Sequence, residues 1–368
     1  MIVWLAHLLR DLTDGLGFLR LADYLSFRAV LASMTAFGFS LMIGRPMILY
    51  LHRKGMRDVV EDFGVIDVAT KRGTPTMGGL IIIAAFLVGY LLWCDLSNPF
   101  TYAGLFSMLG FGGIGFIDDL GKVRGGGGRF GLSQSAKLLL QILLAGALIW
   151  WVSSRNSPLP EDLRTLLFIP FKKEALLDLG WAYAPFMLFV ILAVANSVNF
   201  ADGMDGLATV PVAVSFMVYA VIGYVVGNEV YSNYLHFDYI RGSGEITVIG
   251  GAVLGACMGF LWYNSYPAQV FMGDTGSMAL GGLLASVIIL LKQEMLFVIV
   301  GGIFVAEGAS VLIQQQIGFA LLGRRLLLRA PIHHAFERQG IAETKIVVRF
   351  WMVALLLGFV GLLSLKIR

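Results

Sequence analysis

The sequence predicts an all-α polytopic integral membrane protein. Of its 368 residues, 58% are hydrophobic and 14% are charged, and the mean hydropathy is +0.80. Soluble domains carry about 25% charged residues. A soluble chain cannot hide this much apolar surface, because a large part of any folded surface faces water. The composition therefore disfavours a soluble enzyme, a disordered chain and a nucleic-acid-binding protein, and no nucleic-acid partner is expected.

Ten apolar stretches predict transmembrane helices. A helix needs about 20 apolar residues to cross the hydrocarbon core, and continuous apolar runs favour helices over a membrane β-barrel. The eighth stretch is short, and the ninth contains Glu307. The stretches lie near residues 28–50, 77–94, 100–117, 134–152, 182–198, 207–227, 246–264, 278–291, 296–314 and 346–365.

The segments outside these stretches predict smaller elements of one domain, 1–368. Residues 1–27 contain aspartates that are atypical of a signal peptide, so we expect an N-terminal helix at the membrane interface. Residues 153–181 contain three prolines around a short apolar run and predict a small hairpin. Residues 314–329 extend the ninth span with arginines, which predicts an amphipathic helix in contact with membrane lipid.

The orientation follows from the basic residues, which are more frequent in the loops after odd-numbered spans. The positive-inside rule places these loops in the cytoplasm, the hairpin outside it, and both termini on the non-cytoplasmic side. Five polar segments border the same loops, so we expect one cytoplasmic catalytic cleft. They are residues 71–79, 116–122, 196–207, 264–277 and 330–337.

Five aspartates stand out in these segments. Carboxylates that gather near a low-dielectric boundary repel one another unless a cation joins them. Oxygen ligands favour Mg²⁺, which usually takes one or two protein carboxylates together with substrate phosphates. Helix capping and tight turns are the structural alternatives for the same side chains. The five are Asp118, Asp119, Asp202, Asp205 and Asp274.

Basic and imidazole side chains on the same face suit a phosphate substrate. Lys71, Lys122 and Lys137 are candidates for neutralising phosphate oxygens. The adjacent His333 and His334 favour phosphate binding over zinc, since neither cysteine lies near them.

Two features inside the apolar stretches have open interpretations. Glu307 lies near the middle of a span, where a carboxylate is either functional or a neutral, hydrogen-bonded group. The stripe of Gly251, Gly255 and Gly259 favours close helix packing, within one chain or between two chains.

Five motifs in order resemble those of the bacterial phospho-N-acetylmuramoyl-pentapeptide transferases, within the polyprenyl-phosphate N-acetylhexosamine-1-phosphate transferase superfamily. The resemblance covers nearly the whole chain. It implies transfer of phospho-N-acetylmuramoyl-pentapeptide from its UDP carrier to undecaprenyl phosphate, which gives lipid I and UMP. It also implies Mg²⁺ and a homodimer of ten-helix subunits in the bacterial inner membrane. The motifs are KRGTPTMGG (71–79), FIDD (116–119), NSVNFADGMDGL (196–207), VFMGDTGS (270–277) and APIHHAFE (330–337).

The resemblance also implies roles for individual residues. Asp118 would deprotonate or position the lipid phosphate, and Phe271 would stack on the uracil near Lys71 and Asp205. Ala335 stands where a third histidine is common in the family. The implied catalytic residues are Asp118, Asp119, Asp274, His333, His334, Asn199 and Asp202, with Asp274 and Asp202 as metal ligands. The implied substrate-binding residues are Lys71, Thr76, Lys122, Lys137, Asp205, Asn264, Phe271 and Gln314.

Two other functions remain open at this point. A UDP-N-acetylglucosamine-1-phosphate transferase would share the acidic residues, although the APIHHAFE segment favours the muramoyl-pentapeptide donor. A proton-coupled transporter predicts carboxylates near the membrane midplane, where only Glu307 lies. The transferase reaction itself has two routes, direct attack by the lipid phosphate or a covalent aspartyl-phosphate, and we favour direct attack.

Overall fold

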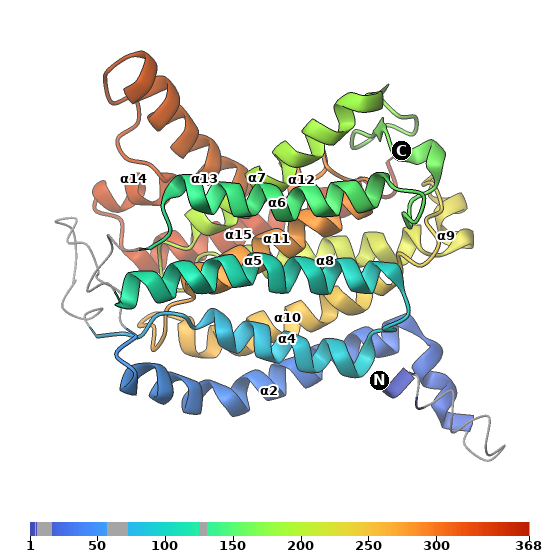
Figure 1. Ribbon diagram of the computed structural model, residues 1–368, viewed down its shortest axis with the longest axis horizontal. Helices are drawn as coiled ribbons and strands as arrows, with labels where there is room; N and C mark the ends of the chain where they lie inside the picture. Colours follow the sequence, from blue (N-terminus) through green and yellow to red (C-terminus); the bar gives the residue numbers. More distant parts are fainter. Residues whose placement is uncertain (4, 6–16, 57–72, 125–130, 368) are drawn as a thin grey trace.

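The computed structural model describes residues 1–3, 5, 17–56, 73–124 and 131–367. Its long helices lie side by side along the horizontal direction of Figure 1. Within the described part, eight helices are long and apolar enough to cross a membrane, which agrees with a polytopic membrane protein. They are α2 (Leu25–Arg53), α5 (Pro99–Arg124), α6 (Gln134–Ser153), α7 (Tyr183–Ala201), α8 (Thr209–Val226), α10 (Glu245–Asn264), α11 (Gly273–Leu290) and α15 (Glu343–Leu363).

The other two predicted spans are helical but differ from the rest. The second is α4 (Gly79–Trp93), an apolar helix of only 15 residues. The ninth is not continuous, in contrast to the prediction, because it divides into α12 (Phe297–Val300) and α13 (Gly302–Leu312) at Gly301. The Phe297 ring fills the space where a side chain on Gly301 would lie, and it stacks with Phe304 at 6.5 Å between ring centroids.

The predicted amphipathic helix over 314–329 ends early. Helix α13 continues as a π-helix, η4 (Ile313–Leu321), and residues 322–331 form turns and bends instead. The reason is a side-chain contact: Oε1 of Gln314 accepts hydrogen bonds from the backbone N–H groups of Leu326 (3.2 Å) and Leu327 (2.8 Å). The chain therefore folds back on η4, which projects from the other helices at the upper left of Figure 1.

Helix α11 forms the centre of the molecule. In its apolar stretch of 18 residues, 89% of the residues are buried, whereas the same fraction for α6, at the periphery, is 22%. It packs against α4, α5 and α7, while α10 packs against α2 and α8. The stripe of Gly251, Gly255 and Gly259 on α10 lies against the backbone of α2, so the stripe packs two helices of one chain.

The shorter elements lie at the ends of the long helices. The predicted hairpin is confirmed as the antiparallel pair of β1 (Leu166–Leu167) and β2 (Leu177–Asp178). In the predicted N-terminal helix, residues 4 and 6–16 lie outside the described residues, and η1 (Gly17–Asp23) is a 3-10 helix. Both termini lie at one end of the bundle in Figure 1, opposite to α14 (Ile332–Arg338), as an even number of crossings requires. The remaining short elements are η2 (Glu161–Leu163), η3 (Gly180–Ala182) and α9 (Glu229–Tyr234).

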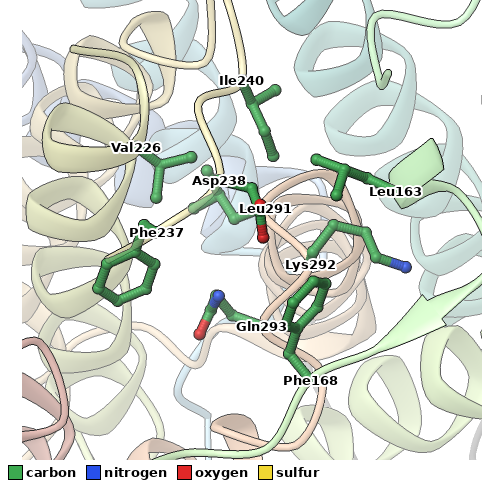
Figure 2. A pocket seen from close by; sticks show the side chains of 9 residues that line it. All are labelled: Leu163, Phe168, Val226, Phe237, Asp238, Ile240, Leu291, Lys292 and Gln293. Carbon is green, nitrogen blue, oxygen red and sulfur yellow. The ribbon is translucent and has the colours of Figure 1, made fainter. Parts of the chain in front are cut away.

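A polar contact network joins the hairpin region to the bundle. It borders a cavity of about 10 Å³, which has room for about one water molecule. Figure 2 shows Lys292 and Gln293 pointing to opposite sides of this cavity. The ammonium of Lys292 lies 3.6 Å from the Tyr183 ring centroid and donates to the backbone oxygen of Arg164 at 3.3 Å. Tyr183 in turn donates its hydroxyl proton to Glu294.

Candidate active site

The amino end of α11 is anchored by a carboxylate from α5. Asp119 accepts hydrogen bonds from the backbone N–H groups of Asp274 (3.1 Å) and Thr275 (2.8 Å) and from the Thr275 hydroxyl (2.6 Å). These are the contacts of a helix cap, and a negative charge there is favoured by the helix dipole. Asp119 is buried, so its carboxylate fixes where α11 begins.

Three elements direct polar side chains at Asp274. Its Oδ2 lies 2.8 Å from Nζ of Lys122 on α5 and 2.7 Å from Nζ of Lys137 on α6. Its Oδ1 accepts a hydrogen bond of 2.7 Å from Nδ2 of Asn199 on α7, and that amide also donates to Ser277 at 2.8 Å. Residues far apart in the sequence therefore converge on one carboxylate.

Asp118 completes the charge cluster. Its Oδ2 lies 2.9 Å from Lys122 and 3.4 Å from Lys137, and its Oδ1 accepts the backbone N–H of Leu132 at 2.7 Å. The side chain of Asp118 is 4% exposed, that of Asp274 16%, that of Lys137 18% and that of Lys122 31%. Asp118 is thus the deepest of the four, and the two lysines form the accessible rim.

Asp202 lies directly after α7. Burial raises the pKa of Asp202 well above its usual range, and the nearby carboxylates of Asp274, Asp119 and Asp205 raise it further. A carboxyl in such surroundings is stabilised either by a proton or by a shared cation. The metal-binding role of Asp202 stays a prediction.

Asp205 and Asn264, predicted to contact the nucleotide, are engaged with the backbone. Asp205 is buried and accepts the N–H of Ala268 at 3.0 Å. The amide oxygen of Asn264 accepts the N–H of Gly206 at 3.0 Å, and its Nδ2 donates to the carbonyl of Val270 at 3.0 Å. Both side chains therefore shape the turn between α7 and α8 and the segment before α11.

The other predicted substrate residues have separate surroundings. Thr76 is buried and its N–H donates to the Met56 carbonyl at 2.9 Å, while Phe271 is half-buried. Gln314 is buried, and its side-chain oxygen is used by the backbone that follows η4. Lys71 lies outside the described residues.

The two histidines occupy different surroundings. His333 is fully buried, and its Nδ1 lies 3.1 Å from Oε1 of Glu307. The side chain of His334 is 19% exposed, and its Nδ1 lies 2.9 Å from Glu337. Burial lowers the pKa of His334, and the adjacent His333 lowers it further. His334 is therefore neutral at pH 7 and the more accessible of the two.

Several residues that support the site side chains were not predicted from the sequence. Ser277 supports Asn199, and the backbone of Leu132 supports Asp118. Gln141 of α6 exchanges hydrogen bonds with Asn196 of α7. A glutamine in an otherwise apolar stretch was the available signal, because an amide at membrane depth needs a partner.

The carboxylates of the site offer oxygen atoms, the donor type that a hard divalent cation prefers. Within the described ranges, no group of three or more His, Cys, Asp or Glu side chains is arranged to hold a metal ion. Asp274 nevertheless offers a partly exposed carboxylate that already attracts two ammonium groups. One or two carboxylates at a phosphate site are what Mg²⁺ usually takes from a protein.

Comparisons with known proteins agree with one another. A family model described as glycosyl transferase family 4 matches residues 101–292. The signature described as phospho-N-acetylmuramoyl-pentapeptide-transferase signature 1 matches residues 71–83. Proteins named phospho-N-acetylmuramoyl-pentapeptide-transferase are similar over their full length. The one from Desulfosudis oleivorans is 44% identical over 99% of this chain and 100% of its own. That from Pelagibacter ubique is 42% identical over the same shares, and that from Ruegeria sp. 44% over 100% of both chains.

Proposed function

Because the chain belongs to the phospho-N-acetylmuramoyl-pentapeptide-transferase family, we propose that it transfers phospho-N-acetylmuramoyl-pentapeptide from UDP to undecaprenyl phosphate. The products are lipid I and UMP, and the reaction is the first membrane step of peptidoglycan synthesis. The observation that carries this proposal is the convergence of Lys122, Lys137 and Asn199 on Asp274 beside Asp118. Phosphoryl transfer requires positioned charges of this kind.

The two rim lysines suit the diphosphate of the donor. They lie against the carboxylates of Asp118 and Asp274. Ammonium groups on flexible stems can turn toward phosphate oxygens when these arrive, and they then balance the charge that develops on the departing UMP. Lys122 is the more exposed of the two and is the one we assign to the first contact with the donor.

Direct attack by the lipid phosphate is favoured over an aspartyl-phosphate. An oxygen of undecaprenyl phosphate attacks the sugar-linked phosphorus, and the bond from that phosphorus to UMP breaks. Asp118 is a poor candidate for a nucleophile, because it is deeply buried and contacted by two lysines and a backbone N–H. We assign it to orienting Lys122 and Lys137, the lysines that would contact the donor diphosphate, beside the position of the acceptor phosphate.

We propose Asp274 and Asp202 as the residues that hold Mg²⁺. The partial exposure of Asp274 and the raised pKa of Asp202 support this assignment. When bound, the ion would polarise the diphosphate and stabilise the leaving group. Because Lys122 and Lys137 both contact Asp274, a cation held by this carboxylate would take the place of at least one ammonium.

The nucleotide would lie along the turn after α7. The half-buried Phe271 offers a ring for stacking on uracil, and Asp205 and Asn264 hold the backbone around it. Lys71, Thr76 and Gln314 are assigned to the same side on the family resemblance. His334, neutral and partly exposed, is assigned to phosphate binding, with His333 behind it.

The membrane arrangement proposed is ten crossings with the active site on the cytoplasmic face of the bacterial inner membrane. The basic residues in the loops at the active-site end support this orientation, and both termini lie at the opposite end. A site at the interface suits an acceptor phosphate that its lipid tail holds there. The homodimer is proposed on the family resemblance.

The test is release of UMP by the purified protein from UDP-N-acetylmuramoyl-pentapeptide, with undecaprenyl phosphate and Mg²⁺. We expect release that stops with EDTA and with Asp274→Ala. UDP-N-acetylglucosamine as donor serves as the control for substrate class. Release with that donor instead would keep the superfamily and overturn the muramoyl donor. Exchange of labelled UMP without any acceptor lipid would overturn direct attack.

A further inference from the structure

Helix α6 carries a site lysine although it is the least buried of the candidate spans. Its buried residues form one narrow seam, since they are spaced by three or four positions: Gln141, Ala145, Leu148 and Val152. Partly buried apolar side chains on either side of this seam, such as Leu144, also pack against the core, and the rest of the helix surface is exposed. Lys137 begins this seam, four positions before Gln141.

The seam contains one reciprocal polar contact to α7. Nε2 of Gln141 donates to Oδ1 of Asn196 at 3.2 Å, and Nδ2 of Asn196 donates to Oε1 of Gln141 at 2.7 Å. The same Nδ2 also donates to the Leu192 carbonyl of its own helix at 2.8 Å. Each amide therefore satisfies the other at a depth where an unpaired amide is costly.

The amide pair lies about one helical turn behind two groups that touch Asp274. Lys137 precedes Gln141 by four residues, and Asn199 follows Asn196 by three, so each couple shares a helix face. Lys137 reaches Oδ2 of Asp274 at 2.7 Å, and Asn199 reaches its Oδ1 at 2.7 Å. The position of α6 along α7 thus decides whether both groups meet one carboxylate.

We propose that Gln141 and Asn196 are positioning residues for the transfer reaction, because they set the register of α6 on α7 and thereby place Lys137 at Asp274. This inference rests on the proposed function. Apolar side chains alone hold such a register weakly, since lipid tails are equally good partners for them. A shift by one residue moves a helix by about 1.5 Å. Such a shift breaks both hydrogen bonds between Gln141 and Asn196 and moves the Lys137 ammonium away from Asp274.

The test separates positioning from simple stabilisation. Gln141→Leu with Asn196→Leu replaces both amides by apolar groups, so neither is left unpaired and the midpoint of thermal unfolding in detergent should change little. We expect UMP release to fall at least about tenfold, because misplacement by about 1 Å is that costly in catalysis. The matched control is Ser107→Ala with Ser286→Ala, which removes a buried hydroxyl pair between α5 and α11; we expect near-normal activity from it.

The coupling to Lys137 is the decisive readout. Lys137→Met should lower activity strongly in the wild-type and control backgrounds. In the Gln141→Leu, Asn196→Leu background, adding Lys137→Met should lower UMP release by less than about threefold, because the Lys137 ammonium has already left Asp274. Multiplicative losses in that background, or full activity of the double leucine variant, would overturn the inference. A wild-type protein that releases no UMP would instead refute the proposed function.

Discussion

Oε1 of Glu307 lies 3.1 Å from Nδ1 of His333, and both side chains are fully buried. The second carboxylate oxygen of Glu307 accepts the backbone N–H of Ile332 at 2.9 Å. The Nε2 edge of the imidazole borders Gly203, where a Cβ would collide with Nε2. A mid-span glutamate of α13 is thereby connected through a histidine of α14 to the turn that carries Asp202.

Replacing Glu307 should test this connection. Glu307→Leu removes the acceptor of the Ile332 N–H and the carboxylate beside His333, and it should destabilise the protein by about 1–3 kcal/mol. Activity should fall by more than the unfolded fraction explains, since the 202–206 turn loses its support. Glu307→Gln keeps the shape and should retain most of the stability. The measurements are thermal unfolding and UMP release on the same preparations. Equal unfolding midpoints and equal rates for the leucine variant and the wild type would disprove the connection.

Gly203→Ala should impair catalysis through the same histidine. The added methyl group would overlap the His333 ring, so either the ring or the turn must move. We expect a fall in kcat of about tenfold or more. Gly146→Ala is the matched control, because a Cβ at Gly146 meets no atom within 4 Å. If both alanine variants kept wild-type kcat, the contact between turn and ring would have no catalytic importance.

Substitutions of the neighbouring Asp118 and Asp119 should have different effects, one on activity and the other on stability. Asp119→Asn weakens three hydrogen bonds at the start of α11 and should lower the free energy of unfolding by about 1–3 kcal/mol. Asp118→Asn changes a group that contacts both lysines and should abolish most activity. Denaturation midpoints and initial rates of UMP release would show the two patterns. If the loss of activity in Asp118→Asn is no larger than its loss of folded protein, the assignment of Asp118 is wrong.

Lys292 should make stability depend on pH. Burial lowers the pKa of Lys292 to about 8, below its usual value in an unfolded chain. Between these two values the unfolded chain binds more protons, so the free energy of unfolding rises with pH. From pH 7.5 to 9.5 the wild type should gain about 2 kcal/mol relative to Lys292→Met. Chemical denaturation at both pH values measures this difference, and parallel changes in the two proteins would contradict it.

Much of the architecture could be predicted because hydropathy is local and additive. Runs such as 28–50 and 134–152 became α2 and α6 with ends a few residues away, and prolines around a short apolar run indicated the hairpin. Clustering of the aspartates at one end also followed from counting spans. Each conclusion needs only the composition of a contiguous segment and the thickness of a membrane.

Partner choice required the tertiary structure. The unusual positions of Asp118, Asp119, Lys137 and Glu307 are visible in the sequence, but nothing local distinguishes two adjacent aspartates. Only the packing of α5 against α11 made Asp119 a helix cap and left Asp118 to the lysines. The pairing of Glu307 with His333 and the break at Gly301 were likewise decided in space. The physical reason is that a buried polar group is stabilised by whichever partner the fold brings within about 3 Å, and that partner can lie anywhere in the chain.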